Sequence, residues 1–272
     1  MKIGQQAHRS SAISTSNEDI ILVRGRDLCA ELLGRITFTD HIWLLVAGEL
    51  PDASQRAVLD AALVAIAEHG LVPSVQASRM TLAAAPEALQ GAVAAGILGC
   101  GSVILGAAET AGRLLADVVS RAAGSSLEEA AAAIVREHHA SRRAVPGYGH
   151  PLHKERDPRA ERLLEIAGQV GRAGPHARAA VAVGRVLPEI TGKQLAMNVS
   201  AAIPAVLLDA GYPLLALKGV PILARTASLV AHLLEEQERP IGFVLSHAGA
   251  SAIRYDGAVP EGFAAPGGRE EP

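Results

Sequence analysis

The chain is poor in aromatic residues, and this shortage bears on the fold class. Phenylalanine, tyrosine and tryptophan make up 3% of the 272 residues, and Trp43 is the single tryptophan. Aromatic side chains are enriched in strands, whereas the alanine and leucine that dominate this chain favour closely packed helices. No segment shows the pattern of a clear strand. We therefore expect an all-α protein.

The chain has no strong excess of positive or negative charge, and it has few cysteines. The formal net charge is −3 at pH 7, so no basic bulk charge argues for binding to nucleic acid. The two cysteines, Cys29 and Cys100, are far apart in the chain and stand in apolar, helix-like settings. We interpret them as small buried side chains in a reducing compartment rather than as a disulfide or a metal pair. No histidines stand at metal-ligand spacing, so we expect no metal site.

Long apolar runs are absent as well. Residues 1–16 are polar and contain no apolar core of signal-peptide length. Elsewhere glycine, glutamate or arginine interrupts each apolar stretch before it reaches the roughly 20 residues that a membrane span needs. These absences predict a cytoplasmic protein with no membrane partner.

Helix signals cover most of the chain. Thr39 is expected to cap a helix that Gly48 ends, and the spacing of Ser125 and Glu128 fits a capping box. The connections are short, which leaves few places for a flexible linker. After a loose polar arm at residues 1–20, apolar spacing predicts helices over residues 27–33, 39–47, 52–69, 86–98, 107–123, 125–138, 157–167, 176–187, 197–208 and 221–237.

The segment at residues 146–160 carries the most information about function. It reads Pro-Gly-Tyr-Gly-His-Pro-Leu-His-Lys-Glu-Arg-Asp-Pro-Arg-Ala, with His150 directly after the second glycine. Glycine lets the backbone approach a ligand closely, and Asp-Pro starts or breaks a helix. A basic, glycine-edged loop that leads into a helix suits a small anion. A solvated basic loop at a helix N-terminus is the alternative interpretation of the same residues.

The whole string resembles the Gly-x-Gly-His…Asp-Pro-Arg signature of the citrate synthase superfamily. Two earlier segments appear in the same order as in that family. Residues 23–28, Val-Arg-Gly-Arg-Asp-Leu, are similar to its Tyr-Arg-Gly segment, and residues 38–51 end in its Gly-Glu-Leu-Pro motif. The chain is thus similar to the short citryl-CoA lyase and citrate synthase-like branch, whose members join or break a carbon–carbon bond between an acyl-CoA and a keto acid.

This resemblance implies a fold and an assembly. Proteins of the family are all-helical, have a large and a small domain, and work as dimers. Residues 1–107 and 206–263 would form the large helical domain, and residues 108–205 the small helical domain. Residues 264–272 are rich in glycine, proline and charge, and we expect them to form a disordered tail.

The resemblance also implies a pocket for a polycarboxylate. His69 and His150 match histidines that bind the substrate, and His150 would lie beside the keto-acid carbonyl oxygen. Arg159, Arg225 and Arg239 match arginines that bind carboxylates, and Arg239 would reach across the interface of a homodimer. Arginine pairs carboxylates through two hydrogen bonds and stays charged, and a histidine can donate to an oxygen that becomes an alkoxide. If Arg225 or Arg239 is considered alone, the alternative interpretation is an ordinary arginine at the protein surface.

Two positions depart from the pattern of the synthases. Ile104 falls where synthases have a histidine that stabilises the enol of the acyl-CoA, and Leu105 replaces the next glycine. Ser200, in Met-Asn-Val-Ser, falls where synthases and lyases have the aspartate that handles the α-proton. A serine hydroxyl without a base beside it is a poor replacement for a carboxylate. Glu109 and Asp209 are the nearest carboxylates along the chain.

The coenzyme A thioester would be a substrate, with no metal. Lys154 and Lys193 could contact its phosphates, and a solvated basic loop is the alternative for these lysines.

Two functions remain open at this point. The first is an enzyme of the citryl-CoA lyase or citrate synthase type, which acts on acetyl-CoA and oxaloacetate with His150 and Ser200 as its candidate catalytic residues. The second is a catalytically impaired paralogue that binds citrate or oxaloacetate as a sensor or regulatory subunit. The retained pocket residues fit both, whereas Ile104 and Ser200 favour the second function or a different substrate.

Overall fold

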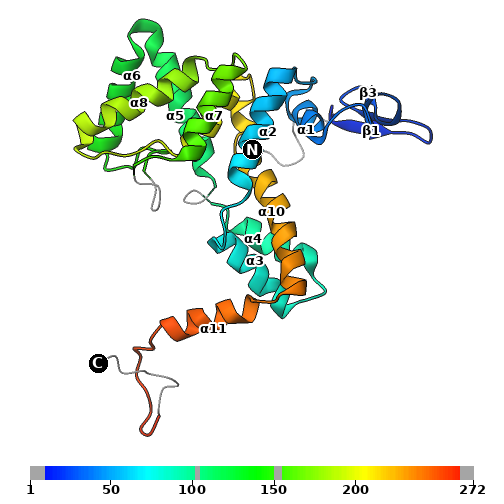
Figure 1. Cartoon of the computed structure of the whole chain (residues 1–272), viewed down its shortest axis with the longest axis vertical. Helices are drawn as coiled ribbons and strands as arrows, with labels where there is room; N and C mark the ends of the chain where they lie inside the picture. Colours follow the sequence, from blue (N-terminus) through cyan, green and yellow to red (C-terminus); the bar gives the residue numbers. More distant parts are fainter. Residues whose placement is uncertain (1–9, 102–104, 150–154, 264–272) are drawn as a thin grey trace. The chain divides into compact units, whose positions relative to one another are not determined.

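The computed structural model describes residues 10–101, 105–149 and 155–263, and helices form most of this part of the chain (Figure 1). The all-α class is thereby confirmed. Two compact units are present: unit 1 comprises Met1–Glu68 and Gly101–Ala224, and unit 2 comprises His69–Cys100 and Arg225–Pro272. The large and small domains expected from the family resemblance divide the chain at other residues, and that division stays a prediction. The expected disordered tail at residues 264–272 lies outside the described residues.

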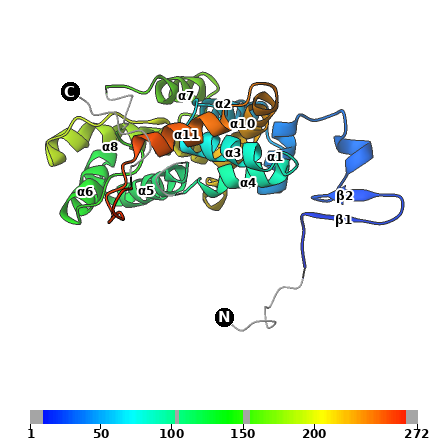
Figure 2. The ribbon, with the colours of Figure 1, turned by 90° about the horizontal axis from the view of Figure 1, so that it is seen from below.

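A small sheet lies near the start of unit 1, and its first strand shows that the loose arm suggested for residues 1–20 was wrong at residues 14–16. Arg24 and Gly25 have positive φ angles of 50° and 77° and turn the chain between two of its strands. The side-chain Nε of Arg24 donates to the carbonyl of Leu45 at 3.0 Å, which ties the sheet to the following helix. Runs this short show no alternation in the sequence. Three antiparallel strands lie in chain order: β1 (Ser14–Ser16), β2 (Ile21–Val23) and β3 (Arg26–Asp27). Figure 2 shows β1 and β2 side by side.

The helices of unit 1 follow the predicted pattern with small shifts at their starts. Thr37, and not Thr39, caps the first α-helix, and Ser126 forms its capping box with Glu129, one residue after the predicted pair. The described helices are η1 (Leu28–Leu32, a π-helical turn), α1 (Phe38–Ala47), α2 (Ala53–Ala67), α5 (Ala107–Arg121), η2 (Ala122–Gly124), α6 (Leu127–Ala140), α7 (Pro158–Gln169), α8 (Pro175–Thr191), α9 (Val199–Asp209) and η3 (Leu214–Ala216).

Helix α9 lies in the core of unit 1. It packs against α2, α5, α7 and α8, and its residues 201–207 are all buried. A helix that is apolar on every side is typical of a buried position. The first turn of α9 is therefore held in place by packing on all sides, and this turn carries Ser200.

Unit 2 is built from α3 (Pro73–Ala84), α4 (Leu89–Leu98), the later part of α10 (Gly219–Glu238) and α11 (Gly242–Ala252). A Cβ at Gly96 would lie 2.6 Å from a methyl carbon of Leu229, so this glycine allows α4 and α10 to pack closely. The sequence did not predict α3, because Ser74, Ser78 and Arg79 are buried there and interrupt the apolar pattern. It did not predict α11 either, since that helix is largely exposed and needs no apolar stripe.

A buried ion pair holds three helices of unit 2 together. Arg79 of α3 is 2% exposed, and its Nε donates to Glu236 of α10 at 2.6 Å. Its Nη1 donates to Glu235 at 2.8 Å, and its Nη2 to the carbonyl of Arg239 at 3.1 Å. The guanidinium therefore has a partner on each nitrogen, which is the condition under which a buried charge is tolerated.

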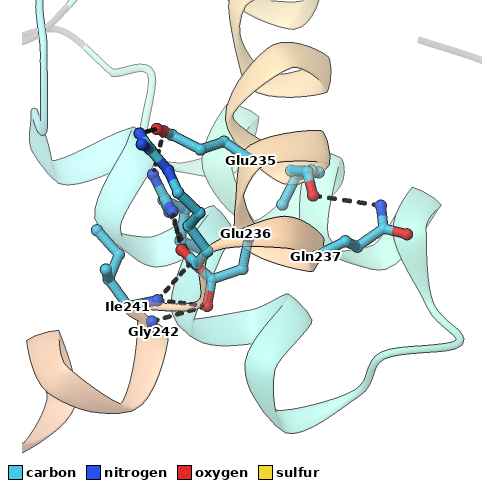
Figure 3. Close-up of polar contacts among 8 residues, drawn as sticks. Glu235, Glu236, Gln237, Ile241 and Gly242 are labelled. Carbon is cyan, nitrogen blue, oxygen red and sulfur yellow. Dashed lines mark hydrogen bonds and ion pairs between the residues drawn. The ribbon is translucent and has the colours of Figure 1, made fainter.

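The Glu236 carboxylate also fixes the start of α11. It accepts hydrogen bonds from the backbone N–H groups of Ile241 and Gly242, the latter at 2.7 Å (Figure 3). A Cβ at Gly242 would lie 2.5 Å from that of Ala83 and 2.7 Å from the carbonyl oxygen of Arg79, so only glycine fits this crossing of α11 and α3.

The structure corrects two further expectations. Both cysteines are free, and Cys100 is buried as expected, but Cys29 is exposed because the turn η1 leaves it at the surface. One stretch, Leu214–Glu238, is long and apolar enough to cross a membrane by length and composition alone. Leu229 and Leu233 within it are fully buried, and a core helix meets the same criterion, so the stretch is weak evidence for a span.

Replacing Glu236 by glutamine should destabilise the protein by about 3–5 kcal/mol at neutral pH, because the variant leaves the Arg79 charge buried without its partner. Burial alone would raise the pKa of Glu236, but the bonds from Arg79, Ile241 and Gly242 outweigh burial and hold it below the usual 4.5. A lowered native pKa gives stability that is fully present above the pKa of the unfolded chain and is lost as the pH falls from there through the native pKa. The deficit of Glu236→Gln should therefore shrink in acid, as measured by urea unfolding at several pH values.

The matched control is Glu235→Gln, which removes the more exposed of the two carboxylates bound to Arg79. Its loss of stability should be clearly the smaller. Equal losses of stability in the two variants would contradict the conclusion that the buried Arg79–Glu236 pair contributes more to stability than the Arg79–Glu235 pair.

Candidate functional site

The loop at residues 147–149 is paired by backbone hydrogen bonds with residues 196–198, the segment that leads into α9 in unit 1. The N–H of Gly149 donates to the carbonyl of Ala196 at 2.7 Å, and the N–H of Asn198 donates to the carbonyl of Gly147 at 2.9 Å. This pairing fixes the backbone directly before His150. His150 itself lies outside the described residues, so its predicted catalytic role stays a prediction.

The glycines and the tyrosine of this loop serve packing. Gly147 has a φ of 87°, and a Cβ there would lie 2.5 Å from that of Ala201 in α9. The hydroxyl of Tyr148 donates to the carbonyl of Ala180 at 2.6 Å, and burial raises its pKa, so it stays neutral. The sequence suggested that glycine lets the loop approach a ligand, whereas at Gly147 the close neighbour is α9.

Asn198 caps α9 and joins the loop to the turn that carries Ser200. Its Oδ1 accepts from the N–H of Ser200 at 2.9 Å, and its Nδ2 donates to the carbonyl of Gly149 at 2.6 Å. Ser200 is half-buried in the first turn of α9, and no described residue hydrogen-bonds to its hydroxyl. The asparagine of the family motif therefore has a structural role here, and the serine hydroxyl is the group left for chemistry.

Asp157 connects this turn to the predicted carboxylate-binding arginine. It caps α7 and is 1% exposed. Its Oδ1 accepts from the N–H and the Nε of Arg159, at 3.1 and 3.0 Å. Its Oδ2 accepts from Nη2 of Arg159 at 2.9 Å and from the N–H of Val199 at 3.0 Å. The side chain of Arg159 and the N–H of Val199, the residue before Ser200, are therefore bound by the same carboxylate.

One nitrogen of the Arg159 guanidinium has no hydrogen-bond partner among the residues that the structure describes. Asp157 occupies Nε and Nη2, while Nη1 donates to no described residue. The side chain is 21% exposed and borders a hollow of about 340 Å³ between α2 and α7, whose other walls are apolar except for Arg162.

Asp157 is poorly suited to replace the aspartate that is missing at position 200. Burial would raise the pKa of its carboxyl, but the hydrogen bonds from Arg159 and Val199 and the charge of Arg159 outweigh burial, so the pKa is lowered. A carboxylate with a lowered pKa and four donors on it is a weak base.

The two carboxylates named from the sequence have other partners. Glu109 pairs with Arg113 at 2.9 Å, one turn along α5. Asp209 ends α9, whereas Ser200 begins it, and nine residues of helix separate them by roughly 13 Å. Asp209 accepts from His176 and from backbone N–H groups at the start of α8 instead. Asp209 is therefore not placed as a base next to Ser200, and the carboxylate of Glu109 is engaged by Arg113.

The region where synthases have a histidine is described only in part. Ile104 lies outside the described residues, and Leu105 is buried with a φ of 66°. A positive φ is strained for a bulky side chain, and such strain often occurs at functional sites. The backbone here has a conformation that glycine adopts freely, although the chain carries leucine.

The other predicted substrate-binding residues belong to unit 2. His69 is its first residue and is half-buried, and Arg225 is 2% exposed in α10. Arg239 follows α10, its side chain is 78% exposed, and its Nη2 donates to Glu235 at 2.6 Å. Their convergence with Arg159 on one ligand stays a prediction.

The predicted coenzyme A contacts also stay predictions. Lys193 is exposed directly after Gly192, which ends α8 in a left-handed conformation, and Lys154 lies outside the described residues. Among the described residues, no group of three or more His, Cys, Asp or Glu side chains could hold a metal ion.

Comparisons with known proteins identify the class. The family model described as citrate synthase, C-terminal domain, matches residues 52–242, which is more than half of the chain. The chain therefore belongs to the citrate synthase family, whose enzymes form or cleave carbon–carbon bonds. No curated protein sequence matches at a significant level.

A solved structure places the chain more closely. The citryl-CoA lyase from Hydrogenobacter thermophilus is 31% identical, with a TM-score of 0.83 over 94% of this chain and 97% of that protein. The ATP citrate lyase from Methanothrix soehngenii, solved with citrate and coenzyme A, is 21% identical, with a TM-score of 0.74 over 97% of this chain and 44% of that one. The citrate synthase from Thermotoga maritima is 20% identical, with a TM-score of 0.64 over 87% and 62%. The last two matches show the shared fold alone.

The sequence did not single out Asp157 or Arg79. Asp157 could have been found, because Asp before Pro is a strong cap signal and the arginine two positions later can fold back onto it. Its bond to Val199 joins residues 42 positions apart and depends on tertiary packing.

Replacing Gly147 by alanine should lower stability more than replacing Gly192 by alanine. Both residues have positive φ, so each substitution costs about 1–2 kcal/mol of backbone strain. Only Gly147 has a close neighbour, since a Cβ there would lie 2.9 Å from the backbone Cα of Ala201, whereas nothing lies within 4 Å at Gly192. Thermal unfolding of the two variants checks this, and equal losses would contradict close packing of the loop on α9.

Proposed function

We propose that the protein is a citryl-CoA lyase, which cleaves citryl-CoA into acetyl-CoA and oxaloacetate. The observation that carries this proposal is the 31% identity with a citryl-CoA lyase over nearly the full length of both chains. The alternative of a non-catalytic paralogue that senses citrate or oxaloacetate has no support from the comparisons.

The carboxylates of the substrate call for fixed guanidinium groups. Arg159 supplies one, because Asp157 holds its Nε and Nη2 and leaves Nη1 to the ligand. We propose that Arg225, Arg239 and His69 complete the pocket. An arginine held in place before the ligand arrives loses less entropy on binding than a mobile one.

The proposed cleavage begins at the tertiary hydroxyl of the citryl group. His150 accepts the proton of this hydroxyl as the oxygen forms the carbonyl of oxaloacetate. The bond between the carbinol carbon and the methylene next to the thioester breaks, and its electron pair passes to the thioester as an enolate. A proton then adds to the methylene carbon and gives acetyl-CoA.

Ser200 takes part in this last step in the proposed mechanism. Its hydroxyl is in the first turn of α9, at the position of the family aspartate, and it makes no hydrogen bond to a described residue. It can donate a proton to the methylene carbon of the enolate and regain one from a water molecule, and the hydroxide formed in this way takes up the proton that His150 accepted. A positioned acid–base group is worth about 10²–10⁴-fold in rate, so a serine in place of a carboxylate predicts a slow enzyme.

The proposal also covers the binding of coenzyme A and the oligomeric state. Lys154 and Lys193 would contact the phosphates of the thioester substrate, and no metal takes part. A homodimer, with Arg239 at the site of its partner, would cover apolar side chains that are exposed in unit 2, such as Phe243 and Val244, which are 69% and 64% exposed. A cytoplasmic location stays a prediction.

Release of oxaloacetate and acetyl-CoA from citryl-CoA by the purified protein tests this function. We expect turnover by the native protein and a loss of about 10²-fold or more in His150→Ala, because that variant lacks the base for the hydroxyl. Ser200→Ala should lower kcat with little change in KM, since Ser200 acts after the substrate is bound. Ser120→Ala, at an exposed position of α5, is the control and should leave both constants unchanged.

Turnover by Ser200→Asp without any turnover by the native protein would contradict the proposal. It would mean that the substrate pocket is intact and that the native chain lacks the acid–base group for this reaction.

A further inference from the structure

The carboxylate of Asp157 touches both chemically distinct parts of the proposed site. Its oxygens bind the guanidinium of Arg159 on α7 and the N–H of Val199, next to Ser200, on α9. We propose that Asp157 is a positioning residue that couples the carboxylate-binding arginine to the Ser200 turn. This inference rests on the proposed function and assigns a role to a residue that does not itself contact the substrate.

Only a carboxylate satisfies the groups around Asp157. Each oxygen accepts two hydrogen bonds: Oδ1 from the N–H and Nε of Arg159, and Oδ2 from Nη2 of Arg159 and the N–H of Val199. All four groups are donors. An asparagine at this position would turn its own NH₂ group toward two of them and would leave those donors buried without an acceptor.

The shared oxygen Oδ2 provides the coupling. A ligand carboxylate that binds Nη1 of Arg159 pulls the guanidinium toward itself, and Nη2 moves with it because the group is planar and rigid. Oδ2 bridges Nη2 and the N–H of Val199, at 2.9 and 3.0 Å, so a displacement of Nη2 changes the bond to α9 as well. A ligand on Arg159 therefore changes the hydrogen bond to the N–H of Val199, the residue that precedes Ser200.

Asp209 offers a matched control in the same unit. Its side chain is 1% exposed, and it also accepts four hydrogen bonds, from the N–H groups of Gly174, His176 and Ala177 and from Nδ1 of His176. It fixes the start of α8 and binds no arginine and no residue of the proposed site. Asp209→Asn should therefore lose stability as Asp157→Asn does, without the effect on the site.

The experiment compares Asp157→Asn with Asp209→Asn by steady-state cleavage of citryl-CoA, oxaloacetate binding, and NMR of the Arg159 Nε–H and the Ser200 amide. We expect Asp157→Asn to weaken oxaloacetate binding and to raise KM by roughly tenfold or more, the usual effect of losing a hydrogen bond to a charged group. It should also shift both NMR signals. Asp209→Asn should leave KM and both signals close to native.

Failure of the two proposals can be told apart. If the native protein does not cleave citryl-CoA, the proposed function fails, and the NMR signals alone decide the positioning role. Unchanged Arg159 and Ser200 signals in a folded Asp157→Asn would overturn the inference. If that variant does not fold, Arg159→Lys replaces it. A lysine cannot reach both oxygens of Asp157, so the Ser200 amide should shift, and an unchanged amide would overturn the coupling.

Discussion

The carboxylate of Asp157 accepts two hydrogen bonds on each oxygen, and its donors belong to two helices that are distant in the sequence. Because the group is buried, each of these bonds forms in a medium of low dielectric constant, where a missing partner is costly. The start of α7, the guanidinium of Arg159 and the first turn of α9 are therefore fixed relative to one another. Packing of α9 on its neighbours and the cap formed by Asn198 extend this constraint to the loop before His150.

Unit 2 is organised by the same kind of interaction. Arg79 and Glu236 are both buried, and their hydrogen bonds reach α3, α10 and the start of α11. A buried pair of this kind contributes definition of geometry more than net stability. It sets the direction of the chain just after Arg239, a residue that the family resemblance assigns to substrate binding.

The sequence predicted the fold well where local signals are strong. The helices predicted to begin near residues 52 and 157 are present, with Asp52 and Asp157 as their N-caps, and Gly48 ends its helix as expected, in a left-handed conformation. The short strands at residues 14–27 were missed because alternation is not visible in two or three residues. Within the site, the Asp-Pro-Arg string located Arg159. The contact of Asp157 with Val199 arises from packing of α7 on α9 and cannot be read from spacing.

Ser200 falls where the family resemblance implies an aspartate. Its first-turn place in α9 matches the motif, and neither Asp157 nor Asp209 takes the place of the aspartate there, since Asp157 is saturated and Asp209 ends the same helix. In the proposed function, the chain keeps the groups that hold a polycarboxylate and changes the group that handles a proton. Its chemistry should therefore be limited by proton transfer, with binding little affected.

A crystal structure with oxaloacetate and coenzyme A bound would test the central claim most directly. The account predicts a ligand carboxylate on Nη1 of Arg159, with Nε and Nη2 still on Asp157, and His150 beside the keto carbonyl. A ligand that is bound without contact to Arg159, or an Arg159 that leaves Asp157 to reach it, would contradict the account.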